Sequence, residues 1–124
     1  MGLAAKFVIP CVLFILTLVF GFWLSRSGKP YNGLLFNIHK LIALAAVIVA
    51  AIRALNALKI VEAQPILIAL LILLGLCAVA LFVTGALMSA NKPAHDRLLT
   101  THQIALLLAV IAAIGMLYLL GGAV

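Results

Sequence analysis

The fold is decided by residues 64–89, which read QPILIALLILLGLCAVALFVTGALMS. This run has no charged side chain, and it is longer than the roughly 20 residues that a helix needs to cross the hydrocarbon core of a bilayer. Two further apolar runs of similar length precede it and one follows it. The sequence therefore predicts four membrane spans, and their expected bounds are 3–25, 33–58, 64–89 and 93–120.

The composition of the whole chain agrees with membrane spans. Of its 124 residues, 69% are hydrophobic and 8% are charged, and the mean hydropathy is +1.44. A soluble domain is typically about 45–50% apolar and needs a polar exterior, which this chain cannot supply. Alternating strands of about ten residues, which mark a membrane β-barrel, are not found in the sequence. The composition predicts an all-α integral membrane protein.

The breaks between the apolar runs are short and carry turn residues, among them Gly28, Pro30, Pro65 and Pro93. Short connections make consecutive helices antiparallel neighbours. We therefore expect one domain over 1–124, folded as an up-down four-helix bundle. Lys6 is followed by a long apolar stretch, as in a signal peptide, but no A-x-A cleavage site comes after it, so we expect this first run to be the first membrane helix.

The net charge of +6 comes from basic residues that lie at the ends of the apolar runs rather than in a stripe. This scatter argues against nucleic-acid binding. Basic residues near membrane spans instead favour the cytoplasmic side. The first and third loops have the larger share, so we expect them in the cytoplasm and both termini outside. This orientation refers to the plasma membrane of a bacterium or archaeon. The residues compared are Arg26, Lys29, Lys40, Lys92 and Arg97 against Lys6, Arg53 and Lys59.

Two histidines, His39 and His102, lie near the starts of the second and fourth runs. In an up-down bundle these two helices run parallel and lie across the diagonal, so both rings are expected at similar depth. A histidine inside a membrane span is costly and usually functional. Two imidazoles fill both axial positions of a haem iron. The sequence thus predicts one haem b held between the second and fourth helices, with His39 and His102 as iron ligands.

Small residues follow each histidine at helical spacing. Two facing alanine stripes would leave room for a macrocycle, although small residues also line ordinary membrane helix interfaces. The free ring N–H of each ligand needs an acceptor, and a carbonyl one turn back is one candidate. The flanking polar residues are equal candidates for orienting a ring or a propionate: Thr100, Thr101 and Gln103 beside His102, and Asn37 and Lys40 beside His39. The stripes consist of Ala43, Ala46 and Ala50 on the second helix and of Ala105, Ala109 and Ala113 on the fourth.

Basic residues near the same end are candidates for the haem propionates. Lys40 and Arg97 have the required charge, and arginine forms bidentate contacts with carboxylates. His95 lies two helical turns before His102 and is a surface residue, a propionate contact or the ligand in its place. Arg53 either snorkels to the outer interface or lines a polar pocket for a quinone or an anion.

The pattern of a histidine near the same end of the second and fourth helices lies in the segments FNIHK (36–40) and TTHQ (100–103). It resembles the four-helix b-type membrane cytochromes, a group that includes bacterial cytochrome b superoxide or quinol oxidoreductases and the ascorbate-reducible cytochromes. The resemblance implies electron transfer with a quinol or a redox partner protein. The chain would then be an electron-transfer protein or an oxidoreductase subunit. Those families commonly hold two haems, whereas three histidines here suffice for one paired site per chain.

Two other functions fit four apolar spans. A small transporter or channel is one, but no acidic residue lies within a span, which argues against a cation exporter. An anion transporter or channel that uses Arg53 is the remaining alternative of this kind. The other is a cofactor-free accessory subunit of a larger membrane complex, and a homodimer is compatible with each reading. The haem site would also serve haem sensing, storage or delivery.

Overall fold

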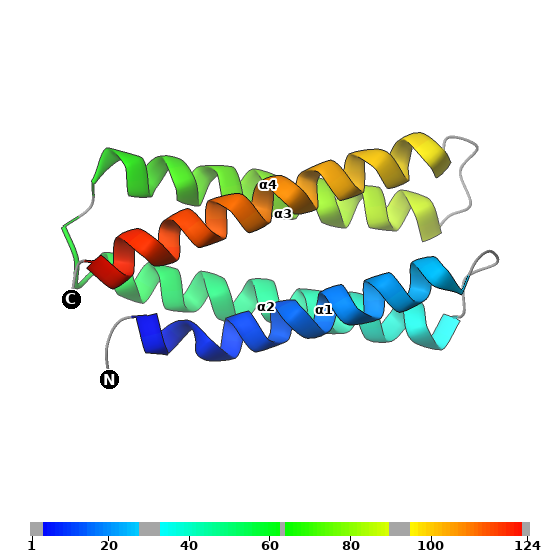
Figure 1. Ribbon diagram of the computed structural model, residues 1–124, viewed down its shortest axis with the longest axis horizontal. Coiled ribbons are helices and arrows are strands. Elements are labelled where there is room, and N and C mark those ends of the chain that lie inside the picture. The colour runs from blue at the N-terminus through cyan, green and yellow to red at the C-terminus, as the bar shows by residue number, and fades with distance from the viewer. Residues whose placement is uncertain (1–3, 28–32, 63, 90–94, 123–124) are drawn as a thin grey trace. The chain divides into compact units, whose positions relative to one another are not determined.

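The computed structural model describes residues 4–27, 33–62, 64–89 and 95–122, and the regular structure in these ranges is entirely helical. A 3₁₀ turn, η1 (Ala4–Phe7), leads into α1 (Val8–Arg26). The remaining helices are α2 (Gly33–Leu58), α3 (Pro65–Ser89) and α4 (His95–Gly122), as Figure 1 shows. The predicted all-α class is therefore confirmed.

The helix bounds agree closely with those expected from the sequence. The second helix has the predicted bounds, and the third starts at Pro65, where a missing N–H costs nothing because the first turn has no partner for it. The first apolar run differs, since it begins as η1 and becomes α-helical only at Val8. Pro10 is tolerated because it lies in the first turn of α1. The expected start of the fourth helix at Pro93 lies outside the described residues, and α4 continues to Gly122.

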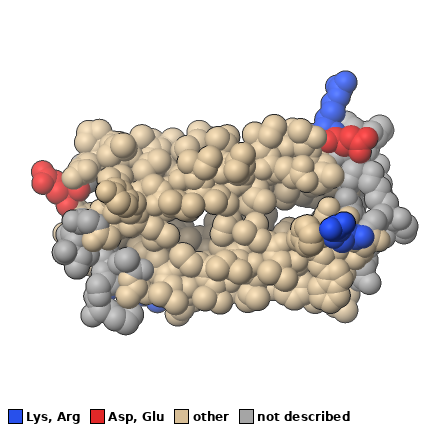
Figure 2. Space-filling model, in the orientation of Figure 1, with Lys and Arg blue, Asp and Glu red and all other residues tan. Residues whose placement is uncertain are grey.

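All four helices are long and apolar enough to cross a membrane. The candidate spans contain 22, 26, 24 and 26 residues in chain order, which matches or exceeds the roughly 20 residues required. On the face seen in Figure 2, the charged side chains lie toward the helix ends and the middle is free of them. These features are those of an integral membrane protein.

The chain divides into two compact units, Met1–Val61 and Glu62–Val124. In the first, here called the N-hairpin, α1 packs against α2, and in the second, the C-hairpin, α3 packs against α4. Figure 1 shows that the two helices of each hairpin are antiparallel. The expected antiparallel pairing of neighbours holds within each hairpin, and the assembly of both into one up-down bundle stays a prediction.

Small side chains are prominent among the buried residues of both hairpins. Small residues let two helix backbones approach closely where the solvent is lipid and no hydrophobic force drives association. In the C-hairpin, a Cβ at Gly115 of α4 would lie 3.5 Å from Leu70 Cδ1 of α3, so the two helices are already in close contact there. The buried residues of α4 recur every three or four positions, at Ala105, Ala109, Ala112, Met116 and Leu120.

We expect the replacement Ala112→Phe to destabilise the protein more than Ile111→Phe. Ala112 is only 1% exposed, whereas its neighbour Ile111 is 58% exposed, so a large ring fits at residue 111 and not at residue 112. Overpacking of this kind costs about 1–3 kcal/mol. The free energy of unfolding of both variants in detergent micelles measures the difference, and equal values for the two would contradict the packing described above.

Candidate functional site

His39 is held by the partner helix of its own hairpin. Its ring is half-buried, and Nδ1 lies 2.9 Å from the main-chain oxygen of Thr17 on α1. A carbonyl oxygen only accepts hydrogen bonds, so the proton is assigned to Nδ1. In the neutral ring, Nε2 then carries the lone pair. The N-hairpin thereby fixes which nitrogen of His39 is able to bind a metal.

The hydroxyl of Thr17 takes no part in holding His39. It donates to the carbonyl oxygen of Leu13, one turn earlier on α1, at 2.8 Å, a bond that threonines commonly make within helices. The main-chain oxygen of Thr17, and not its hydroxyl, therefore accepts the hydrogen bond from His39. A carbonyl oxygen has two lone pairs, so the one at Thr17 can accept this bond in addition to a helical one.

Gly21 provides the space for the His39 ring. A Cβ at this position would lie 2.8 Å from Cε1 and 3.2 Å from Nδ1 of His39, which is closer than side chains pack. Gly21 is one helical turn after Thr17, so both residues lie on the same face of α1. The ring therefore packs against the backbone of Gly21, and its N–H donates to the Thr17 carbonyl one turn earlier on α1.

The C-hairpin holds His102 in a related way. Its Nδ1 lies 2.8 Å from the hydroxyl oxygen of Thr84 on α3, and Thr84 is only 6% exposed. That hydroxyl has one proton, and it donates to the carbonyl oxygen of Ala80 at 2.7 Å. Because the hydroxyl proton is committed to Ala80, Nδ1–H of His102 is assigned as the donor to Thr84.

The two hairpins thus share a local pattern: a threonine on the first helix, a histidine on the second and a glycine beside the ring. In the C-hairpin the glycine is Gly85, where a Cβ would lie 3.8 Å from Cε1 of His102, an ordinary contact. The candidate acceptor one turn back is replaced in both cases by one on the neighbouring helix. Throughout the described ranges, each buried side-chain nitrogen or oxygen has a hydrogen-bond partner.

The alanines expected to line a haem lie on the histidine helices as predicted. Ala46 of α2 and Ala105 and Ala109 of α4 are buried, and Ala43 is half-buried. The outer two residues of the stripes, Ala50 and Ala113, are half-buried as well. Their contact with a macrocycle stays a prediction.

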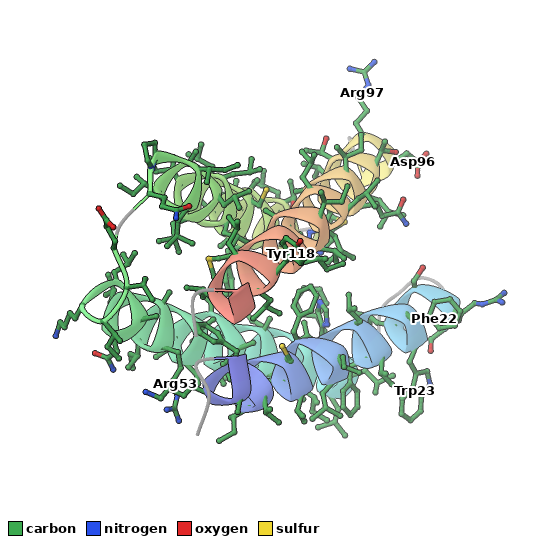
Figure 3. The ribbon with its side chains drawn as sticks, turned by 60° about the vertical axis from the view of Figure 1, so that its left-hand side comes forward. Phe22, Trp23, Arg53, Asp96, Arg97 and Tyr118 are labelled. Atoms are coloured by element: carbon green, nitrogen blue, oxygen red, sulfur yellow. The ribbon has the colours of Figure 1, made fainter. Side chains whose placement is uncertain are left out.

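Lys40 and Arg97 lie at exposed positions, whereas Arg53 is half-buried. Lys40 places its Nζ 6.0 Å from the centre of the Phe36 ring. Arg97 extends away from α4 beside Asp96, and Arg53 projects near the C-terminal end of α2, as Figure 3 shows. His95 is the first residue of α4, and its side chain lies outside the described part. The roles of Lys40, Arg97 and His95 at a propionate stay predictions.

Sequence reasoning missed the residues that seat the two rings, namely Thr17, Gly21, Thr84 and Gly85. The signal was present, because Thr17 and Thr84 are the hydroxyl residues in the interiors of the first and third apolar runs. Each also has a glycine within the following turn. The threonines next to His102 in sequence, Thr100 and Thr101, donate to the carbonyl oxygens of Asp96 and Arg97 on their own helix, at 3.0 and 2.9 Å.

Comparisons of the chain with protein-family models, with curated proteins and with solved structures give no match.

We expect Gly21→Ala to destabilise the protein by about 1–3 kcal/mol, because the new methyl group meets the His39 ring and forces it off the Thr17 carbonyl. The matched change Gly85→Ala is expected to be neutral or to stabilise by about 0.5–1 kcal/mol, since alanine favours a helix and has room there. Unfolding followed by circular dichroism in detergent measures both.

A double-variant cycle isolates the contact between residue 21 and the ring. In a His39→Ala background, Gly21→Ala should lose its destabilising effect because the ring is no longer there to be displaced. A penalty of the same size in both backgrounds would show that the methyl group clashes with something other than His39.

Proposed function

We propose that this chain is a membrane-embedded b-type cytochrome in which Nε2 of His39 and Nε2 of His102 would hold the iron of one haem b. The observation that carries the proposal is the pair of Nδ1–H bonds, to the Thr17 carbonyl and to the Thr84 hydroxyl. Histidines that bind metals almost always give their other ring N–H to an acceptor, which sets the tautomer and the ring direction. Both proposed ligands, His39 and His102, have that support.

The donor chemistry fits haem iron. A neutral imidazole whose N–H is hydrogen-bonded is a stronger electron donor through its other nitrogen, and two such rings fill the axial positions of a b-type haem. Haem b supplies reversible one-electron chemistry when it is bound. The protein's part is to hold two nitrogens in fixed orientations within an apolar environment. A haem held by two histidines would suit electron transfer with a quinol or a redox partner protein.

The surroundings of one end of the N-hairpin support a membrane location. Trp23 and Phe22 are exposed near the end of α1, and the Arg26 guanidinium lies 5.2 Å from the centre of the Phe22 ring. Aromatic residues with adjacent basic ones are typical of the interface between lipid and water. We place this end, with the first and third loops, at the cytoplasmic face of a plasma membrane.

Purified protein supplied with haem is expected to show a sharp Soret band, and α and β bands that split on reduction with dithionite. Either His39→Ala or His102→Ala should abolish this bis-histidine spectrum because each removes one axial nitrogen. The measurement is the optical spectrum in detergent, with haem counted per chain. The expected value is one haem for each chain.

The change His95→Ala is the matched control, since it removes a histidine from the same helix as His102 and should leave the spectrum unchanged. If His95→Ala and not His102→Ala removed the bands, the ligand would be His95. A wild-type protein that folds and takes up no haem would overturn the proposal. That result would favour the transporter or the accessory-subunit hypothesis instead.

The orientation is tested by labelling single cysteines from outside intact cells. Ser27 and Gln64 are both exposed; Ser27 directly follows α1, before the first loop, and Gln64 directly precedes α3, after the second. In a background with Cys11 and Cys77 replaced, a membrane-impermeant maleimide should modify Gln64→Cys and spare Ser27→Cys until the cells are opened. The reverse labelling pattern would place the first and third loops outside.

A further inference from the structure

We infer that Thr84 is a positioning residue for His102, and that its hydroxyl group makes the two iron ligands unequal. This inference rests on the proposed function, and it names a residue that controls the strength of one ligand. Its basis is the different way in which the two hairpins receive the histidine N–H. The N-hairpin uses the main chain of Thr17, and the C-hairpin uses the side chain of Thr84.

The Thr84 hydroxyl is itself held in place from two sides. It lies 2.7 Å from the carbonyl oxygen of Ala80 and 3.2 Å from that of Leu81, and the residue is almost fully buried. Both carbonyls belong to α3, so the hydroxyl oxygen has a fixed direction toward α4. A chain of bonds therefore runs from the imidazole N–H of His102 through Thr84 to Ala80. Within such a chain each bond polarises the next.

Within the described residues, the hydrogen-bond acceptor of His39 is not a side chain. Its acceptor is a main-chain oxygen, which no substitution at Thr17 removes, and the Thr17 hydroxyl bonds to Leu13 instead. The isosteric change of threonine to valine therefore affects the histidine of the C-hairpin and not that of the N-hairpin. At residue 84 it deletes the acceptor of a ligand ring, and at residue 17 it deletes a hydroxyl that the ring does not use.

The expected effect of losing the Thr84 hydroxyl follows from how a hydrogen-bonded imidazole donates to iron. An acceptor on Nδ1–H raises the basicity of Nε2, which favours the ferric state and holds the reduction potential down. Thr84→Val should therefore raise the midpoint potential and accelerate haem loss, by about 10–100-fold on the scale typical of outer-shell partners. Thr84→Ser should keep wild-type behaviour because it keeps the hydroxyl.

The test begins with the apoprotein in detergent micelles, where ¹⁵N NMR of histidine reports which ring nitrogen carries the proton. His102 should be protonated on Nδ1 in the wild type and in Thr84→Ser, and should gain the Nε2-protonated form in Thr84→Val. Thr17→Val is the matched control and should leave the signals of both His39 and His102 unchanged. The wild-type spectrum decides the tautomer even if the valine variant does not fold.

The same four proteins are then loaded with haem, and their haem dissociation rate and midpoint potential are measured. Effects in Thr84→Val that are absent from Thr84→Ser and Thr17→Val would support the inference. Wild-type His102 protonated on Nε2, or equal effects of the two valine changes, would overturn it while leaving haem binding intact. A wild-type protein that takes up no haem would overturn the proposed function itself, and the inference with it.

Discussion

An imidazole N–H inside an apolar helical hairpin must find its acceptor within the protein, and this constraint organises both halves of the chain. Lipid offers no hydrogen bonds, so an unpaired polar group there costs several kcal/mol. The partner helix meets the need each time, through the main chain at Thr17 and through the hydroxyl at Thr84. The threonine hydroxyls meet their own need by donating to carbonyls one turn back.

Meeting that constraint requires the two helices of a hairpin to lie close together. A ring of modest size must reach a backbone oxygen or a short hydroxyl on the neighbouring helix, and bulky residues at the contact would hold the helices apart. Gly21, which has no side chain beside His39, is the clearest case. Ala105 and Ala109, which follow His102 on α4, are likewise small and buried. Large apolar side chains such as Ile72 and Ile111 lie on the exposed surfaces instead.

The sequence predicted the helices well because their existence depends on length and apolarity alone. The bounds of α2 and the start of α3 at Pro65 followed from turn residues and from the loss of apolar character. The histidines could also be singled out, because a polar ring is conspicuous in an apolar run. The all-α class is confirmed, and the haem that these rings are proposed to bind stays a prediction.

The partners of the histidines could not be predicted for a physical reason. Finding Thr17 opposite His39 requires knowing how α1 is rotated about its own axis, and a polar stripe usually gives that information. Here α1 and α3 are apolar on every side, so the periodicity of the sequence does not distinguish the face toward the partner helix from the exposed face. Thr100 and Thr101 were candidates for the same reason, since proximity in sequence to His102 was the only guide available.

The close fit between Gly21 and His39 also limits the order in which the two positions can change during evolution. As long as the imidazole remains, any side chain larger than hydrogen at residue 21 displaces it from its place. Once a lineage loses the imidazole, that restraint disappears, and the vacated space can be filled from either helix. Restoring the histidine would then require the glycine to return first, because a side chain at residue 21 occupies the space of the ring. The loss of the histidine is therefore difficult to reverse by a single substitution.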